Sequence, residues 1–405
     1  MTINILRSSF QTDEFVWNEY AELIEQLKNE YQAEILIIGD DTIPVETQGI
    51  ASLSDVVMIA TGGVENLFKT LFRGEGPVTL IADGRNNSLA AALEILTWLE
   101  CQGVEGKILH GADAPLQGLR IGLFGEPSDW LIASGVDRAY LLERFGVETV
   151  DIDLQRLIDG IKAVPQTEAV AVAKDIVKRA QDIKEPSCAD MVEAAKAYLA
   201  IKKICQEERL DAMTIRCFDI VKACGTTSCL ALALLNDEGI VAGCEGDMQT
   251  LMSMLLVKRL CGAEAFMANP SQLTATTTML AHCTIPLKMC DGFSIRSHFE
   301  SGLGAAVQGM LPMTDYTIFK WGGPRLDRYF VAEAQAVETP YSDHFCRTQI
   351  TLNIDLRPYL LEHPIGNHHV IVKGKHGEAV REAMRKLGVR STLEDDPECR
   401  ALPHH

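Results

Sequence analysis

Hydrophobic residues follow two alternating patterns over the first 115 residues. Short apolar runs of strand type occupy residues 3–6, 34–38, 56–61 and 78–82. Apolar positions at helical spacing occupy residues 13–30, 63–72 and 87–101. Strands that alternate with amphipathic helices are typical of βαβ units. The pattern therefore predicts a first domain, residues 1–115, with an open and mostly parallel sheet.

The same kind of pattern continues from residue 116 to residue 271. Strand-like runs occupy residues 120–124, 148–152, 210–216 and 265–268. Helical patterns occupy residues 140–145, 167–184, 189–206 and 247–261, and an apolar segment lies at 230–236. Pro186 interrupts the long helical region because proline cannot continue a helix. We expect a second α/β domain here.

From about residue 272 the pattern changes to β-like runs separated by Gly, Pro and Asp turns. These runs occupy residues 276–283, 316–321, 326–337, 348–354 and 369–373. Only residues 377–387 show a convincing helical pattern in this region. The sequence predicts a third domain, residues 272–405, with an antiparallel sheet or barrel and one terminal helix.

Composition narrows the class of protein. With 405 residues, 47% hydrophobic and 23% charged, the chain can bury a large core. Its 37 basic and 56 acidic residues give a formal charge of −19, which disfavours duplex nucleic acid and anionic membranes as partners. The 12 cysteines form no CxxC pair, no apolar run approaches membrane length, and the first residues lack a leader pattern. We expect a soluble, cytoplasmic protein.

The most informative polar residues lie where a loop enters the apolar helix predicted at 247–261. Glu245 and Asp247 flank a glycine there. Asp247 suits a helix N-cap, whereas a carboxylate among apolar neighbours, as at Glu245, needs a partner or a metal. Asn269 ends a buried run just before Pro270, where it is either a turn former or part of a ligand site at a strand end.

The predicted third domain holds most of the histidines, and four of them lie in candidate segments: His282, His298, His368 and His369. A single histidine is more often a core residue than a ligand, and adjacent His368 and His369 on a strand would point to opposite faces. Imidazoles combined with carboxylates suit Mn²⁺, Zn²⁺ or Fe²⁺. No HExxH, HxH or CxxC spacing is present, so the residues alone predict a carboxylate and histidine site between the second and third domains.

Five segments, taken together and in order, carry a resemblance to a known family. They are CEGDMQTLMSMLL (244–256), FMANP (266–270), LAHCTIP (280–286), RSHFESG (296–302) and GNHHVIVKG (366–374). This set resembles the L-fucose/L-arabinose isomerase superfamily, specifically its shorter fucose-isomerase-like proteins. The matches cover most of residues 225–390, while the first two domains fit the family by their α/β architecture.

The resemblance implies two open α/β (Rossmann-like) domains followed by a C-terminal antiparallel β-barrel domain. It implies a bound divalent metal, with Mn²⁺ expected, and the interconversion of aldoses and ketoses through a cis-enediol. It also implies a homotrimer or homohexamer in which each active site borrows groups from the first domain of a neighbouring subunit. The substrate stays open between a pentose, a deoxyhexose and an anionic hexose such as a sulfonated or phosphorylated sugar. Basic residues that could serve an anionic sugar are Arg7, Arg73, Arg85 and Arg120.

Carried over residue by residue, the resemblance makes Glu245 a metal ligand and the acid/base. His368 corresponds to the histidine ligand, with His369 as the open alternative. Asn269 falls at the position of the family's second acid. This is a departure, because an amide oxygen can bind a cation but cannot take a proton.

The second acid/base is therefore open between Asp247, His282, Glu300 and a metal-bound water. Substrate-binding roles are expected for His282, Arg296, His298, Glu300, Lys320 and His369. Two other readings remain: a metal-enolate enzyme on the same scaffold, such as an epimerase, dehydratase or aldolase-like enzyme, and a non-catalytic sugar-binding protein.

Overall fold

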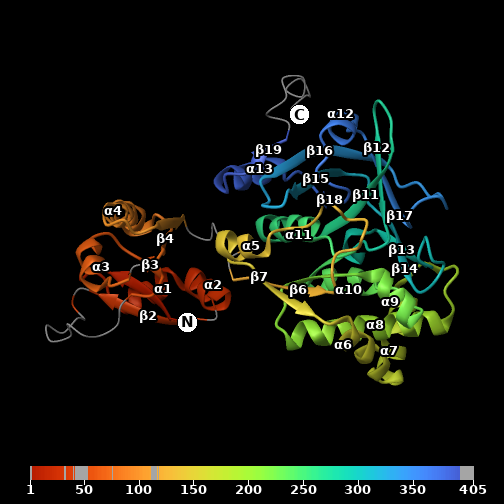
Figure 1. The fold of residues 1–405 in the computed structure, drawn as a ribbon, viewed down its shortest axis with the longest axis horizontal. Helices are drawn as coiled ribbons and strands as arrows, with labels where there is room; N and C mark the ends of the chain where they lie inside the picture. Colours follow the sequence, from red (N-terminus) through yellow and green to blue (C-terminus); the bar gives the residue numbers. More distant parts are fainter. Residues whose placement is uncertain are drawn as a thin grey trace. The chain divides into compact units, whose positions relative to one another are not determined.

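The structure is a computed structural model of the chain. It describes residues 2–31, 33–39, 41, 53–74, 76–110, 116 and 118–392. The chain divides into two compact units, Met1–Gly118 and Leu119–His405, drawn in red to orange and in yellow to blue in Figure 1. The further division at residue 271 stays a prediction.

The first unit holds a five-stranded parallel sheet in the order β2-β1-β3-β4-β5. Its strands are β1 (Thr2–Arg7), β2 (Glu34–Gly39), β3 (Val56–Ile59), β4 (Val78–Ala82) and β5 (Gly106–His110). Its helices are α1 (Asp13–Glu19), α2 (Ala21–Tyr31), α3 (Glu65–Leu71), α4 (Ser88–Cys101) and the 3₁₀ turn η1 (Arg85–Asn87). The predicted parallel α/β unit is confirmed. The single helix expected over residues 13–30 is wrong, because Tyr20 leaves helical geometry and separates α1 from α2.

Strand alternation explains why this sheet is covered on both faces. Ile3 and Ile5 of β1 pack in one apolar cluster with residues of α1 and α2. Leu6 points the other way, into a cluster with residues of α3 and α4. Successive side chains of a strand face opposite sides, so a nearly continuous apolar strand requires helices on both faces.

The second unit begins with a four-stranded parallel sheet in the order β10-β9-β6-β7. Its strands are β6 (Arg120–Phe124), β7 (Glu148–Ile152), β9 (Ala212–Ile215) and β10 (Val241–Cys244). The helices are α5 (Arg138–Phe145), α6 (Leu154–Ala163), α7 (Gln166–Arg179), α8 (Cys188–Glu207), α9 (Cys217–Cys224), α10 (Cys229–Glu238) and α11 (Met248–Cys261). The apolar segment 230–236 lies inside α10. The helix expected to run to residue 184 ends at Arg179, because β8 (Asp182–Ile183) pairs with β13 (Gly292–Arg296).

The rest of the second unit is mainly antiparallel, as predicted. A seven-stranded sheet has the order β15-β18-β11-β12-β17-β16-β19, and β15 also pairs with β16. Its strands are β11 (Ala265–Leu273), β12 (Thr278–His282), β15 (Asp315–Gly322), β16 (Arg328–Glu338), β17 (Thr348–Leu352), β18 (His369–Lys373) and β19 (Arg390–Ser391). Smaller elements are β14 (Ala306–Met310), which pairs with β13, the 3₁₀ turn η2 (Leu287–Met289), α12 (Arg357–Glu362) and α13 (Gly377–Lys386). The expectation of a single helix in this region is wrong, since α12 precedes α13. The β15–β16 pairing favours a barrel, which stays a prediction.

Helix α11 joins the two sheets of the second unit (Figure 1). It packs against β9 and β10 on one side and against β11, β15 and β18 on the other. Residues 248–257 of this helix are all buried, as expected for a helix enclosed on every face. Its N-terminus is therefore fixed beside the ends of β10 and β18.

Two smaller findings concern the expected cellular setting. Within the described residues, no helix is long and apolar enough to cross a membrane. The described cysteines are all free thiols, and most are buried or half-buried, with Cys101 and Cys188 exposed.

Candidate functional site

The candidate site is built around the turn between β10 and α11. The Asp247 N–H donates to the Cys244 carbonyl over 3.1 Å, which closes a four-residue turn. Its central residues, Glu245 and Gly246, have φ angles of 62° and 74°, the φ pattern of a type I′ turn. Gly246 adopts this conformation without strain, whereas Glu245 is strained by about 1–2 kcal/mol. Such strain in a non-glycine residue concentrates at functional sites.

Glu245 faces two histidines from the antiparallel sheet. Its Oε1 lies 3.9 Å from His282 Nε2 at the end of β12 and 3.6 Å from His368 Nε2 just before β18. The three potential ligand atoms all lie within 4.8 Å of one another. Atoms that each bind a metal at ~2.1 Å are at most ~4.2 Å apart. A shift of a few tenths of an ångström would therefore bring these three groups around one cation.

His368 is held in place by a buried carboxylate. Its Nδ1 lies 2.9 Å from Asp247 Oδ2, which also accepts a hydrogen bond from the Thr250 hydroxyl at 2.8 Å. Asp247 Oδ1 caps α11 by accepting from the Thr250 N–H at 2.9 Å. This contact leaves Nε2 of the imidazole directed toward Glu245, which is the usual arrangement of a carboxylate behind a metal-binding histidine.

The pKa values of Glu245, His368 and His282 describe how these three groups share protons when no cation is bound. Burial acts to raise the pKa of Glu245, but nearby His368 and His282 outweigh it and lower the pKa to about 2. Burial acts to lower the pKa of His368, but Asp247 and Glu245 raise it to about 9. His282 has its pKa lowered to about 4 by burial and by His368, so at neutral pH it is the neutral, ligating form of imidazole.

Two buried polar atoms that have no hydrogen bond among the described residues are His368 Nε2, in the group itself, and Asn269 Oδ1, on the neighbouring strand β11. The 3.6 Å from His368 Nε2 to Glu245 is too long for a hydrogen bond. In β11, Asn269 pairs with Ala281, which precedes His282, and Ala268 pairs with His369, which follows His368. Buried polar atoms are rarely left without a partner. A carboxylate, two imidazoles and an amide oxygen together fit a divalent first-row metal.

The structure distinguishes between the two adjacent histidines. His369 is buried, with Nε2 2.9 Å from the Tyr359 hydroxyl and Nδ1 2.9 Å from the Asn367 carbonyl oxygen. Burial and the charge of Lys320 lower its pKa to about 3. Both ring nitrogens are thus engaged away from Glu245, and His368 is the histidine that faces the site.

Asp247 is the N-cap of α11, as the sequence predicted, but its contact with Lys320 was not anticipated. Lys320 is completely buried, where its ammonium donates to the Thr250 hydroxyl at 2.7 Å and lies 3.7 Å from Asp247 Oδ2. Asp247 is also completely buried. Neither side chain reaches open space, so the structure supports them as groups that hold His368 rather than as contacts to a substrate.

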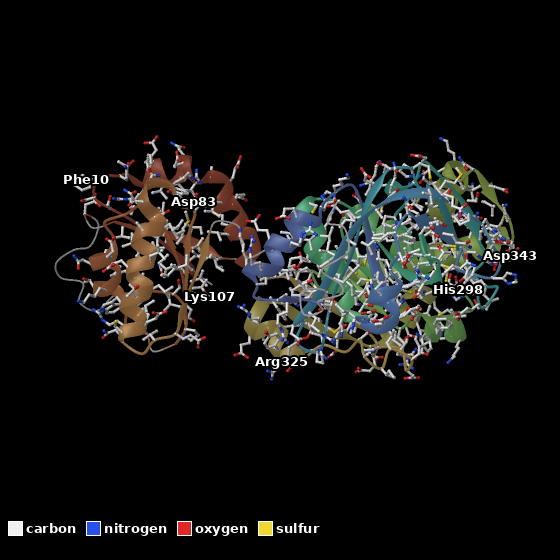
Figure 2. All side chains as sticks on the ribbon, turned by 90° about the horizontal axis from the view of Figure 1, so that it is seen from above. Phe10, Asp83, Lys107, His298, Arg325 and Asp343 are labelled. Carbon is white, nitrogen blue, oxygen red and sulfur yellow. The ribbon has the colours of Figure 1, made fainter. Side chains whose placement is uncertain are left out.

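The other expected substrate-binding residues lie in and after β13. Arg296 donates to Glu185, whose pKa it lowers to about 2, and to Gln308. Glu300 is exposed in the turn that follows. His298, labelled in Figure 2, is buried with Nδ1 3.0 Å from the Ser301 hydroxyl.

Trp130 is a site residue that the sequence did not indicate. Its indole N–H donates to Glu245 Oε2 over 2.6 Å, and its ring packs edge-on against Phe218 with centroids 5.0 Å apart. Trp130 and Glu245 are 115 positions apart in the sequence, so no local spacing could have linked them. The only available signal was a tryptophan shortly after the strand-like run at residues 120–124.

The first unit carries a separate cavity of about 500 Å³. It lies beyond the carboxyl ends of β1, β3 and β4, where ligands gather in open α/β sheets. Its lining includes Ser8, Gln11, Thr61, Gly63, Asn86 and Phe10, the last labelled at the edge of this unit in Figure 2. Ser8 is 6% exposed, and no hydrogen bond to its hydroxyl occurs in the described residues.

Basic residues considered for an anionic sugar are mostly paired with acids. Arg7 binds Asp13 and Asp41, and Arg85 binds Asp83 and Glu19. Arg120 binds Glu148. Arg73 donates to the carbonyl of Phe72 in the first unit.

The fold and the site together define an α/β protein with a buried Glu/His/His group able to hold a divalent metal. No family model matches the chain. It is 24% identical over 285 residues to a protein named sulfoquinovose isomerase from Alkalicoccus urumqiensis. The aligned region covers 67% of this chain and 63% of that protein. A protein of the same name from Priestia aryabhattai is 24% identical over 290 residues, covering 69% of this chain and 65% of the relative. The chain therefore spans less than two thirds of the length of these relatives.

Proposed function

We propose that the chain is a metal-dependent aldose–ketose isomerase of the fucose/arabinose isomerase superfamily that acts on a sulfonated sugar. The observation that carries this proposal is the Glu245, His282 and His368 group, in which His368 Nε2 has no hydrogen bond among the described residues. The name of the relatives, sulfoquinovose isomerase, supports both the reaction and the sugar class. Among the substrates left open by the sequence, this similarity favours the anionic one.

In this proposal Glu245, His282, His368 and Asn269 would hold a divalent cation, with Mn²⁺ expected. When bound, the cation would polarise the sugar carbonyl and offset the negative charge of the enediolate. Glu245 is the base that removes the proton next to the carbonyl and returns it to the neighbouring carbon. Asp247 fixes the His368 ring and the turn that carries Glu245.

A second group must move the proton between the two oxygens of the cis-enediol. Asp247 is completely buried and already engaged by His368, Thr250 and Lys320, so it does not suit this role. His282 would bind the cation through Nε2 while its Nδ1 lies 2.9 Å from the Thr284 hydroxyl, so it has no free nitrogen for this role. A water at the site remains suitable, and Glu300 would have to reach the site from an exposed turn. Asn269 provides an oxygen ligand but no proton.

A substrate panel tests the proposal directly. Purified protein with Mn²⁺ would be incubated in D₂O with 6-sulfonated and 6-phosphorylated hexoses, a deoxyhexose and a pentose, and products followed by NMR. We expect conversion of the sulfonated aldose to a ketose, with deuterium entering the product and no C–C cleavage. Glu245→Gln should lower turnover by at least about a thousandfold, because the base is lost. Glu143→Gln, at an exposed position of α5, is the matched control and should retain activity.

Two results would overturn the proposal. Cleavage or dehydration of the sugar would indicate a different metal-enolate reaction on the same scaffold. A protein that binds no divalent ion and shows no turnover with added Mn²⁺ would indicate a non-catalytic sugar-binding protein.

We further propose that the chain forms a homotrimer or homohexamer in which the first unit of one subunit borders the Glu245 site of another. The cavity beyond β1, β3 and β4 has a largely polar lining, and the Ser8 hydroxyl there has no hydrogen bond among the described residues, which supports a ligand-facing role for the first unit. No charged side chain of that cavity is needed for such a role, because hydroxyl and amide groups suffice to bind sugar hydroxyls.

A further inference from the structure

The loop between β6 and α5 is fastened to the segment that carries Glu245. The Ser128 N–H donates to the Glu245 carbonyl at 2.8 Å. The Gln249 side chain donates to the carbonyls of Ala133 and Gly135 at 2.9 and 3.1 Å. The backbones also approach closely, since a Cβ on Gly246 would lie 2.5 Å from Pro127 Cα. The loop is thus held in place both before and after Trp130, and these contacts fix the position of Trp130.

Trp130 lies between the Glu245 carboxylate and solvent. Its side chain is 52% exposed, whereas the side chain of Glu245 is 13% exposed. Tryptophan has a large apolar surface, so its exposure in a loop is informative. The loop is already held by several hydrogen bonds, so its stability does not depend on the exposed indole. The N–H edge of the Trp130 indole is therefore bonded to the Glu245 carboxylate, while much of its ring is exposed to solvent.

Two further rings follow Trp130 in a row of edge-on contacts. Phe218 in α9 meets Trp130 edge-on, and His298 meets Phe218 edge-on with ring centroids 5.5 Å apart. These three rings come from a loop, a helix and a second loop, so only the tertiary structure brings them together. His298 Nε2 has no hydrogen bond among the described residues, which leaves a polar group at the far end of the row.

We propose that Trp130 is a substrate platform and a positioning residue for Glu245. Its exposed ring stacks on the C–H face of the sugar, while its N–H fixes Glu245 Oε2 so that Oε1 faces His282 and His368. Aromatic faces carry partial negative charge and attract the partly positive hydrogens of a sugar face. This inference rests on the proposed function for its ligand, but the contact between Trp130 and Glu245 stands on geometry alone.

Two variants separate the roles of the ring and of the N–H. Trp130→Phe keeps an aromatic ring and removes the donor, so kcat should fall about tenfold with little change in KM. Trp130→Ala removes both, so KM should also rise about tenfold or more. Trp17→Phe, at a partly exposed tryptophan of α1 in the first unit, is the matched control and should change neither constant.

A second readout does not depend on turnover. The chain has four tryptophans, and Trp130 is the one that contacts Glu245. Titration with Mn²⁺ alone should quench tryptophan fluorescence in the wild type and in Trp17→Phe, and the saturable quenching should be lost in Trp130→Phe.

The results distinguish the possible failures. Wild-type protein inactive on every sugar would count against the proposed function, while the Mn²⁺ titration would still test the position of Trp130. Active wild type with unchanged kcat and KM in both Trp130 variants would overturn the platform role. Quenching that persists in Trp130→Phe would overturn the position beside the cation site.

Discussion

The Asp247 carboxylate joins three parts of the second unit at a single residue. It caps α11, accepts from the Thr250 hydroxyl and holds His368 Nδ1, all without solvent contact. The buried ammonium of Lys320 lies 3.7 Å away and offsets its charge. Burial acts to raise the pKa of Asp247, but Lys320 and His368 keep it well below its usual value, so the carboxylate is ionised at neutral pH.

Asp247→Asn should therefore weaken Mn²⁺ binding by about 10- to 100-fold, because an amide holds the imidazole less firmly and removes one negative charge. Isothermal titration calorimetry with Mn²⁺ measures the change. Asp137→Asn is a suitable control, since Asp137 also caps a helix, accepting from the Tyr140 N–H at 3.0 Å. Equal affinities in the two variants would show that Asp247 acts only as a cap.

At the scale of elements, the site depends on the close approach of two turns. The β10–α11 turn carries Glu245, and the β6–α5 loop passes directly over Gly246. Parallel strands β6 and β9 are neighbours, and β9 in turn pairs with β10, so the loops at their carboxyl ends meet at one edge of the sheet. A side chain at position 246 would separate them.

Gly246→Ala should destabilise the protein more than Gly239→Ala. Both glycines have positive φ, at 74° and 97°, so each substitution costs about 1–2 kcal/mol in backbone strain. Only position 246 adds a steric conflict, with Pro127 Cα 2.5 Å from the new Cβ, whereas nothing lies within 4 Å at position 239. Overpacking adds about 1–3 kcal/mol. Urea denaturation midpoints followed by tryptophan fluorescence compare the two, and matching midpoints would contradict the close approach.

At the scale of the whole molecule, the candidate cation site and the separate cavity lie in different units. The first unit has its own parallel sheet, two apolar clusters and a cavity. The second unit holds every residue of the Glu245, His282 and His368 group. Sharing of a site between subunits can therefore be tested by placing mutations in different units.

Co-expression of Glu245→Gln with a Ser8→Ala/Gln11→Ala chain should restore activity if sites are shared between subunits. Random assembly gives a site with an intact Glu245 from one chain and an intact first unit from its neighbour in about one quarter of cases. Light scattering of the wild type should report a trimer or hexamer. Glu245→Gln co-expressed with His368→Ala is the control, because both changes lie in the proposed cation-binding group of the second unit and no rescue is expected. Absence of rescue in the first pair would place each site within a single chain.

The sequence by itself determined the main elements of the fold and several site residues. Apolar alternation in β1 and the helical spacing in α4, α8 and α11 are local properties of the chain, so they could be recognised without a structure. Glu245 was identifiable because a carboxylate in an apolar segment needs a partner. His282 and His368 were identifiable as histidines next to buried strands.

The tertiary structure alone decided how these residues combine. Strand direction and register at β18 placed His368 toward Glu245 and His369 toward Tyr359. The crossing of the β6–α5 loop over Gly246 brought Trp130 to Glu245. Enclosure of α11 between two sheets turned Asp247 into a buried partner of both His368 and Lys320. The contacts of Trp130 with Glu245 and of His368 with Asp247 join residues 115 and 121 positions apart, and pairing over such separations is fixed by packing rather than by local sequence preference.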